Sequence, residues 1–150
     1  MAGRSIRWEC SRDDSSSDGH TLNTVSSPSP ASPSLLIVDD ERQILELLEL
    51  SLQQYGFEVT PAGSGPQALK LLRAGHYDLV VLDVLMAPWD GFETARNIQE
   101  VPGCPPIVFL SGVSGAAQQE QGLRLGAAYL TKPFRPSQLV EVIRQILHRG

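Results

Sequence analysis

Polar side chains that could act together stand at the ends of four short apolar runs. Asp39 and Asp40 follow the first run, and Asp83, Ser111 and Lys132 stand at the ends of three later ones. A nearly continuous aliphatic run is typical of a strand that is buried on both faces of a parallel sheet. The carboxyl ends of such strands meet at one edge, where open α/β sheets bind their ligands. We therefore expect these side chains to converge at that edge.

The residue types point to phosphoryl transfer onto Asp83. If the first and third strands are neighbours, the parallel spacing of ~4.8 Å brings Asp39 and Asp40 close to Asp83. Three crowded carboxylates repel one another and require a cation, and an all-oxygen ligand set suits Mg²⁺. Lys132 is a compact charge that can neutralise a phosphoryl oxygen, and the Ser111 hydroxyl can donate to another. A carboxylate nucleophile, Mg²⁺ and a lysine are the parts that this reaction needs.

The elements that must hold these groups alternate regularly along the chain. Apolar runs predict strands at 35–38, 57–60, 78–83, 107–110 and 127–131, and helical spacing predicts helices at 41–54, 64–75, 90–99, 116–125 and 137–148. Strands and helices in strict alternation imply an α/β fold, a doubly wound parallel sheet with helices on both faces.

Local signals refine this pattern. The second strand alternates apolar and polar residues and precedes Pro61, so we expect it at an edge of the sheet. Ser64 and Ser114 are the predicted N-caps of the second and fourth helices. The inward face of the first helix is predicted to consist of Ile44, Leu45, Leu47, Leu48 and Leu52.

The first 34 residues differ in composition from the rest. Residues 11–34 hold nine serines and three prolines but only two large aliphatic residues. Such a segment buries too little apolar surface to offset the entropy lost when it is ordered. We therefore expect a disordered tail at 1–34 and a single domain at 35–150.

Charge and hydropathy argue against several classes of partner. The net charge is −5, and lysines and arginines form no cluster, so we expect no nucleic-acid binding by this chain. The N-terminus lacks an apolar core of signal-peptide length, and no apolar run reaches the ~18 residues of a membrane span. We expect a soluble, cytoplasmic protein that does not bind membranes.

Taken together, several short motifs resemble the receiver domain of two-component response regulators, the CheY-like family. The motifs are Asp39-Asp40, Tyr77-Asp78-Leu79 through Asp83, Met86, Asp90-Gly91, Ser111-Gly112, Gly126-Ala127 and Lys132-Pro133-Phe134. The resemblance covers roughly residues 34–149 and implies a flavodoxin-like (βα)5 fold with strand order 2-1-3-4-5.

The resemblance also implies the chemistry of the site. Phosphate passes from the phosphohistidine of a sensor histidine kinase, or of a histidine phosphotransfer protein, to Asp83. Mg²⁺ is held by Asp39, Asp40, Asp83 and the backbone carbonyl of Leu85. Lys132 and Ser111 contact the phosphoryl group. Such a protein is not an enzyme in the usual sense, although it assists its own phosphorylation and dephosphorylation.

The same resemblance implies a switch and its partners. Ser111 and Tyr129 are the switch residues, and Tyr129 moves inward on activation. The surface that responds is made by the fourth helix, the fifth strand and the fifth helix, and it binds a downstream protein target. A homodimer through this face is a further expectation from the family.

The loop after Asp83 departs from the family pattern. Receivers usually have Met-Pro there, whereas this chain has Met86-Ala87-Pro88. Asp90-Gly91 keeps its usual distance from Asp83, so nothing is inserted. The proline stands one place later, in the loop that carries the Leu85 carbonyl.

Three alternative functions were weighed against the receiver. A dinucleotide-binding enzyme is suggested by the glycine-containing segment 63–68, which follows a strand and opens a helix, but it leaves Asp39, Asp40 and Lys132 unexplained. A phosphatase of the haloacid-dehalogenase type has a second Asp two residues after its nucleophile, where this chain has Leu85. A receiver-like interaction module that is not phosphorylated is the milder alternative, and the presence of all key groups argues against it.

Overall fold

The computed structural model describes residues 32–112 and 115–149. Its strands form one parallel sheet in the order β2-β1-β3-β4-β5, which confirms the predicted fold class and strand order. The strands are β1 (Ser34–Val38), β2 (Glu58–Ala62), β3 (Leu79–Asp83), β4 (Ile107–Ser111) and β5 (Ala128–Thr131). The helices are α1 (Arg42–Gln54), α2 (Gly65–Ala74), α3 (Gly91–Ile98), α4 (Ala116–Leu125) and α5 (Pro136–Arg149).

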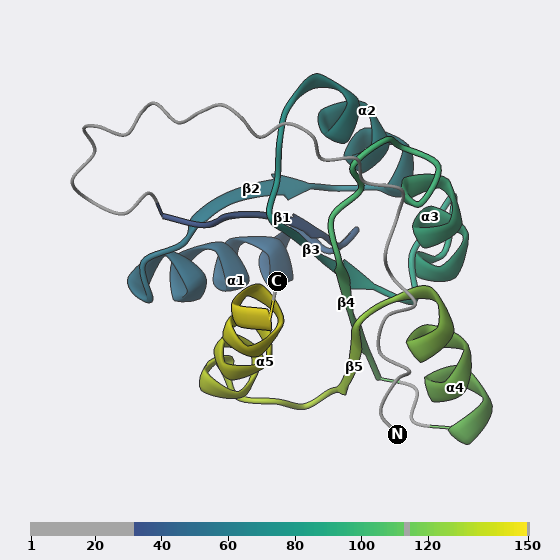
Figure 1. Ribbon diagram of the computed structural model, residues 1–150. Helices are drawn as coiled ribbons and strands as arrows, with labels where there is room; N and C mark the ends of the chain where they lie inside the picture. Colours follow the sequence, from purple (N-terminus) through teal and green to yellow (C-terminus); the bar gives the residue numbers. More distant parts are fainter. Residues whose placement is uncertain (1–31, 113–114, 150) are drawn as a thin grey trace.

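Helices cover both faces of the sheet (Figure 1). α1 and α5 lie on one face, and α2, α3 and α4 lie on the other. In β1, Leu36 and Val38 join the apolar cluster under α2 and α3, while Leu35 and Ile37 join the cluster under α1 and α5. The central strands are therefore buried on both faces, which explains why their sequences are continuously apolar.

The edge position predicted for β2 is confirmed, but its bounds lie one to two residues further along the chain than expected. Phe57 was assigned to the strand, yet its N–H donates to the Leu52 carbonyl and closes the end of α1. Pro61 lies inside the strand, opposite Ile37. An edge strand tolerates a proline because one side of its backbone needs no partner strand.

Two local predictions for the helices need correction, and one is confirmed. Leu47 was placed on the inward face of α1, but its side chain is 61% exposed. The buried residues of α1 are Leu45, Leu48 and Leu52. They are three and four residues apart, so their side chains lie on one face of the helix. The N-cap of α4 is Gly115 instead of Ser114, which lies outside the described residues. Ser64 caps α2, accepting from the Gln67 N–H at 3.2 Å.

Most of the predicted tail, residues 1–31, lies outside the described residues. The first strand, β1, begins at Ser34, one residue inside the predicted tail. The Ser34 N–H donates to Asp78 Oδ2 at 2.7 Å, and the Ser34 carbonyl accepts from the Asp78 N–H at 2.7 Å. Among the described helices, none has the length and apolar content that crossing a bilayer requires.

The start of α3 packs directly against the end of β3 at Gly91, whose N–H donates to the Val84 carbonyl at 2.7 Å. A Cβ at this position would overlap the Asp83 carbonyl oxygen and lie 2.7 Å from Val84 Cα. We expect Gly91→Ala to lower the free energy of unfolding by about 1–3 kcal/mol in chemical denaturation, because backbone atoms must shift.

The matched control for Gly91→Ala is Gly63→Ala, whose added Cβ would meet only Gln67 Oε1, at an ordinary 3.6 Å. We expect the control to change stability little. Equal stability of the two variants would contradict a close approach at Gly91.

Candidate functional site

The predicted site residues gather at the carboxyl edge of the sheet. β3 lies between β1 and β4, so Asp83 is flanked by Asp39, which follows β1, and by Ser111, the last residue of β4. Lys132 follows β5, and its backbone N–H donates to the Ser111 carbonyl at 2.7 Å. The expected convergence of these residues at one edge is therefore what the structure shows.

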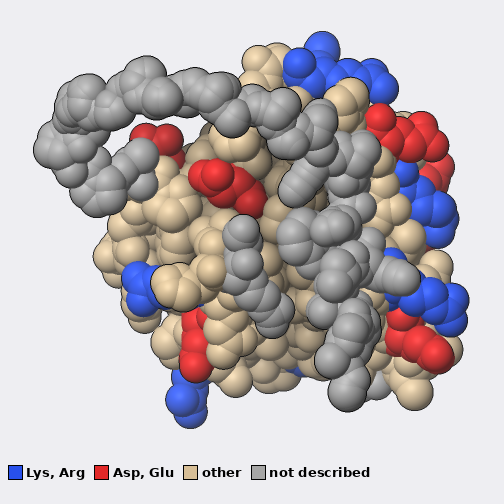
Figure 2. Space-filling model, viewed as in Figure 1, with Lys and Arg blue, Asp and Glu red and all other residues tan. Residues whose placement is uncertain are grey.

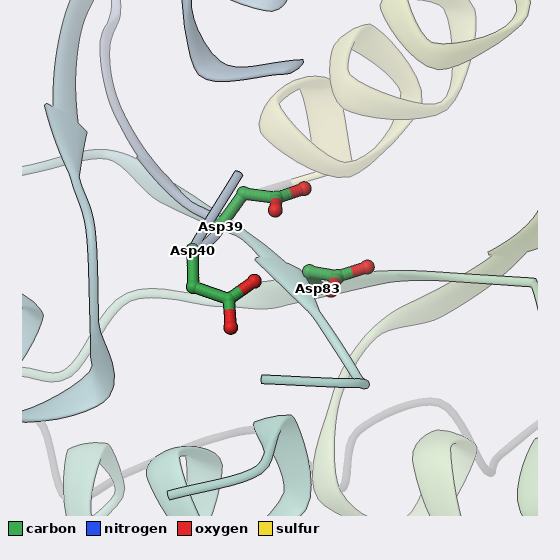
Figure 3. A group of neighbouring side chains, drawn as sticks. All are labelled: Asp39, Asp40 and Asp83. Carbon is green, nitrogen blue, oxygen red and sulfur yellow. The ribbon is translucent and has the colours of Figure 1, made fainter. Parts of the chain in front are cut away.

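Three carboxylates form the centre of this site (Figure 3). Asp39, Asp40 and Asp83 each offer an oxygen, and these oxygens lie within 4.8 Å of one another. Their side chains point to the same side, beyond the ends of β1 and β3. Asp39 and Asp83 are only 3% and 5% exposed, whereas Asp40 is exposed. Two of the three carboxylates are thus shielded from water, and the site is accessible to solvent at Asp40.

Lys132 is the cation that faces this cluster. Its Nζ donates to Asp83 Oδ1 at 3.0 Å and lies 4.0 Å from Asp39 Oδ2. The first distance is a charge-assisted hydrogen bond, and the second is too long for one. Lys132 therefore offsets the negative charge of Asp83 by a direct hydrogen bond. It offsets the charge of Asp39 only through electrostatic attraction over the longer distance.

Asp39 has one satisfied and one unsatisfied oxygen. Oδ1 accepts from the Glu41 N–H at 2.9 Å, two residues along the chain, as aspartates do in turns before a helix. Oδ2 is buried and has no hydrogen-bond partner in the described structure. A buried acceptor without a donor costs free energy, so its place beside two further carboxylates favours an additional positive ligand.

The electrostatics follow from this burial. Removal from water raises the pKa of Asp39 to about 6, and the charge of Asp83 adds to that effect, while the Glu41 N–H opposes it. Burial also raises the pKa of Asp83, and the Lys132 hydrogen bond and charge oppose the increase. Both carboxylates are therefore destabilised in their charged form, and a bound cation would relieve this.

The donor set fits a hard divalent cation such as Mg²⁺. All the side-chain ligands are carboxylate oxygens, and one of them is a buried oxygen without a partner. A cleft of about 430 Å³ opens beside Asp39 and Asp40. A larger cleft of about 1230 Å³, at the end of α1 and along α5, contains none of the site residues. Leu85 has a 61% exposed side chain in the loop after β3, and the role of its carbonyl stays a prediction.

Ser111 and Tyr129, the predicted switch residues, lie on neighbouring strands. Ser111 is completely buried at the end of β4. Tyr129 lies in β5 opposite Phe109, its ring half-buried and centred 6.3 Å from the Phe109 ring. Ser111 is thus next to the carboxylates, whereas Tyr129 is further from the edge, along the same pair of strands.

Two supporting features were not foreseen from the sequence. The Glu41 N–H holds Asp39 in place, and Gly91 allows α3 to begin against the Asp83 carbonyl. The position of an aspartate two residues before a helix N-cap, here Glu41, could have indicated the first contact. No signal in the sequence indicates the second, because it depends on the approach of α3 to β3.

The start of α2 does not have the arrangement that a dinucleotide site needs. Such a site presents free N–H groups at a helix N-terminus. Here the Gly63 N–H donates to Gln67 Oε1 at 2.8 Å, and the Gln67 N–H donates to the Ser64 hydroxyl. Two of the local donors are therefore used by side chains of the same segment.

Three carboxylates and one lysine lie at one edge of a five-stranded parallel sheet, and comparison with known proteins identifies the class. The family model of the response regulator receiver domain matches residues 35–144. The chain belongs to this family, the receiver domains of two-component systems.

Curated relatives are transcriptional regulators about twice as long as the matched segment. A probable transcriptional regulator, ycf27 of Cyanophora paradoxa, is 39% identical over 116 residues, which cover 77% of this chain and 48% of that protein. The transcriptional regulatory protein AfsQ1 of Streptomyces coelicolor is 41% identical over 119 residues, 79% of this chain and 52% of that protein. The chain thus spans about half the length of these relatives.

Solved receiver structures share the fold. A putative response regulator from Chloroflexus aurantiacus has a TM-score of 0.74 at 36% identity, with 79% of this chain and 99% of that one covered. The response regulator TrrA of Thermotoga maritima, solved in complex with Mg²⁺–BeF, has a TM-score of 0.69 at 33% identity, with 76% and 98% covered.

The raised pKa of Asp39 makes stability depend on pH in a way that can be tested. Between the unfolded value of 3.8 and the folded value of about 6, the folded protein binds more protons than the unfolded chain. The contribution of Asp39 to stability therefore increases as the pH falls through this range. In EDTA, lowering the pH from about 7.5 to about 5 should raise the unfolding free energy of wild type relative to Asp39→Asn by on the order of 1–3 kcal/mol.

This prediction is checked by chemical denaturation of both proteins at each pH. Titrating groups far from Asp39 are shared by the two proteins and cancel in the difference, whereas Asp83, whose charge interacts with that of Asp39, contributes to it. A difference that is constant with pH would show that the Asp39 carboxyl group titrates normally.

Proposed function

We propose that this receiver works in the cytoplasm as the phosphoacceptor of a phosphorelay. A sensor histidine kinase, or a histidine phosphotransfer protein, donates the phosphoryl group to Asp83 in a Mg²⁺-dependent reaction. The observation that carries the proposal is the contact of Lys132 Nζ with Asp83 Oδ1 at 3.0 Å, next to the buried and unpartnered oxygen of Asp39.

The transfer balances with the groups at this edge. A carboxylate oxygen of Asp83 forms a bond to phosphorus, and the phosphorus–nitrogen bond to the donor imidazole breaks, with its electron pair returning to the imidazole. Lys132 neutralises charge on the phosphoryl oxygens, because its compact ammonium already lies beside Asp83. The Ser111 hydroxyl, at the end of the neighbouring strand, donates to another phosphoryl oxygen.

The metal would be held by Asp39, Asp40, Asp83 and the backbone carbonyl of Leu85. When bound, Mg²⁺ neutralises charge that develops on the transferred group. The Glu41 N–H fixes Asp39 through Oδ1, and the buried Oδ2 has no hydrogen-bond partner in the described structure, which supports Asp39 as a ligand. The structure of the TrrA relative in complex with Mg²⁺–BeF supports the assignment by similarity.

The consequence of phosphorylation is a change in a protein-interaction face. We propose that Ser111 turns toward the phosphoryl group and that Tyr129 then rotates inward, changing the face made by α4, β5 and α5. That face binds a downstream protein, or a second copy of the chain. Direct nucleic-acid binding is not part of the proposal, because on the face shown in Figure 2 lysine and arginine side chains stand apart instead of forming one patch.

Incubation with acetyl phosphate and Mg²⁺ should add the mass of one phosphoryl group to the wild-type chain, measured by intact mass spectrometry. Asp83→Asn removes the nucleophile, so we expect no increase, and EDTA should abolish the increase in wild type. Asp78→Asn is a matched control, because Asp78 directly precedes the amino end of β3, at the far end of the strand from Asp83. Its carboxylate accepts from the Ser34 N–H. Phosphate uptake that persists in Asp83→Asn would exclude Asp83 as the acceptor.

The switch is tested with beryllofluoride, which mimics the phosphoryl group. We expect its binding, in the presence of Mg²⁺, to shift amide resonances in α4, β5 and α5 more than those in α1 and α2. Ser111→Ala lacks the donor hydroxyl and should reduce these shifts. Resonances of α4, β5 and α5 that stay in place, while those around Asp83 move, would show that binding occurs without the proposed coupling.

A further inference from the structure

α4 is held less firmly by its side chains than the helices beside it. Of its ten residues, all within the described part of the chain, only Gly122 is buried. α2 and α3, on the same face of the sheet, bury four and five residues. The N-cap residue, Gly115, has no side chain with which to cap the helix. Leu125 is half-buried against the apolar cluster, and the one fully buried position of α4 is a glycine.

The carboxyl end of α4 is attached more firmly. Gln99 Nε2, at the end of α3, donates to the Leu125 carbonyl at 2.7 Å. The Ala127 N–H donates to the Ile107 carbonyl at 2.7 Å, and a Cβ at Gly126 would lie 2.8 Å from the same carbonyl oxygen. This end is thus attached to α3 and, through the residues that follow it, to β4.

Gly122 faces the ring of Tyr129. A Cβ built at this position would overlap Cδ2 of the Tyr129 ring, would lie 2.9 Å from its Cε2, and would lie 3.4 Å from Phe109 Cδ2. On its inner side the ring meets Phe109, which in turn packs edge-on against Phe92 at 5.3 Å. The Tyr129 ring therefore occupies a space between a packed aromatic pair and the bare backbone of α4.

The presence of glycine here is not explained by the helix itself. Glycine is a poor residue inside a helix, and alanine at an ordinary helical position would stabilise it. The contact with Tyr129 supplies the missing reason, because any larger residue would displace either the ring or the helix.

We propose that Gly122 is a positioning residue that couples α4 to the orientation of Tyr129. The ring can occupy its present position only while position 122 of α4 carries no side chain, and α4 can approach β5 only as far as the ring allows. Each therefore constrains the other. The link from this pair to Asp83 rests on the phosphoryl switch proposed above, whereas the coupling of ring and helix does not.

The coupling is tested by a double-mutant cycle of Gly122→Ala with Tyr129→Ala, read by thermal unfolding. With the ring present, Gly122→Ala should lower Tm. In the Tyr129→Ala background the obstacle is gone, so the same change should leave Tm equal or raise it. Additive effects would overturn the proposal, and if Gly122→Ala alone fails to fold, rescue by Tyr129→Ala gives the same answer.

A second measurement distinguishes ring displacement from general destabilisation. With ¹³C-labelled tyrosine, Gly122→Ala should shift the Tyr129 ring resonances and leave those of Tyr55 and Tyr77 unchanged. Gly115→Ala, at the N-cap of the same helix, is the matched control, since its Cβ would meet only the flexible Gln118 side chain, and it should move no tyrosine ring. Unchanged Tyr129 resonances in Gly122→Ala would overturn the proposal.

A third measurement separates this inference from the proposed function. Gly122→Ala leaves Asp83, Lys132 and Ser111 untouched, so it should still take up one phosphoryl group from acetyl phosphate. Beryllofluoride should then shift the α4 amides less than in wild type. Full wild-type shifts of α4 in this variant would refute the coupling. Failure of wild type itself to be phosphorylated would refute the proposed function and leave the Tm and ring results to decide the coupling.

Discussion

The burial of two carboxylates beside one another is the constraint on which the site depends. Asp39 and Asp83 lie almost entirely out of water at the ends of adjacent strands, and this desolvation raises both pKa values. Repulsion from Asp83 adds to the increase for Asp39, and repulsion from Asp40 adds to the increase for Asp83. Lys132 offsets part of this by its hydrogen bond to Asp83, but it lies too far from Asp39 to satisfy the buried Oδ2. The folded domain thus keeps a local deficit of positive charge, which a bound divalent cation would fill.

The parallel sheet is what makes such an arrangement stable. The apolar runs of β1 and β3 are buried on both faces, so the rest of the domain holds the strand ends rigidly. Backbone contacts then place the charged groups: the Glu41 N–H orients Asp39, the Lys132 N–H is tied to the Ser111 carbonyl, and Gly91 brings α3 against β3. The repulsion between the carboxylates is tolerated because the apolar core, whose stability does not come from these residues, holds the strand ends in place.

The opposite property, weak attachment, distinguishes α4. It contributes one buried residue, a glycine, and its carboxyl end is attached to α3 by the Gln99 side chain. Elements that move in response to a ligand are drawn from the less stable parts of a fold. In the function proposed above, the sheet edge would accept the signal, and the lightly packed helix beside Tyr129 would pass it on.

Most of the fold and of the site was determined by the sequence alone. The alternation of apolar runs with helical patterns predicted every element of the sheet and its helices, and the polar residues at strand ends predicted which groups would meet, because strand ends share an edge. The sequence could not decide matters of exact placement. Leu47 is predicted on the inward face of α1, yet it is exposed. It is a leucine directly beside the buried Leu48, and the sequence does not distinguish a leucine that faces the core from one that faces solvent. The orphaned Asp39 oxygen and the contact of Gly122 with Tyr129 were decided only by tertiary structure, because both depend on distances between segments far apart in the chain.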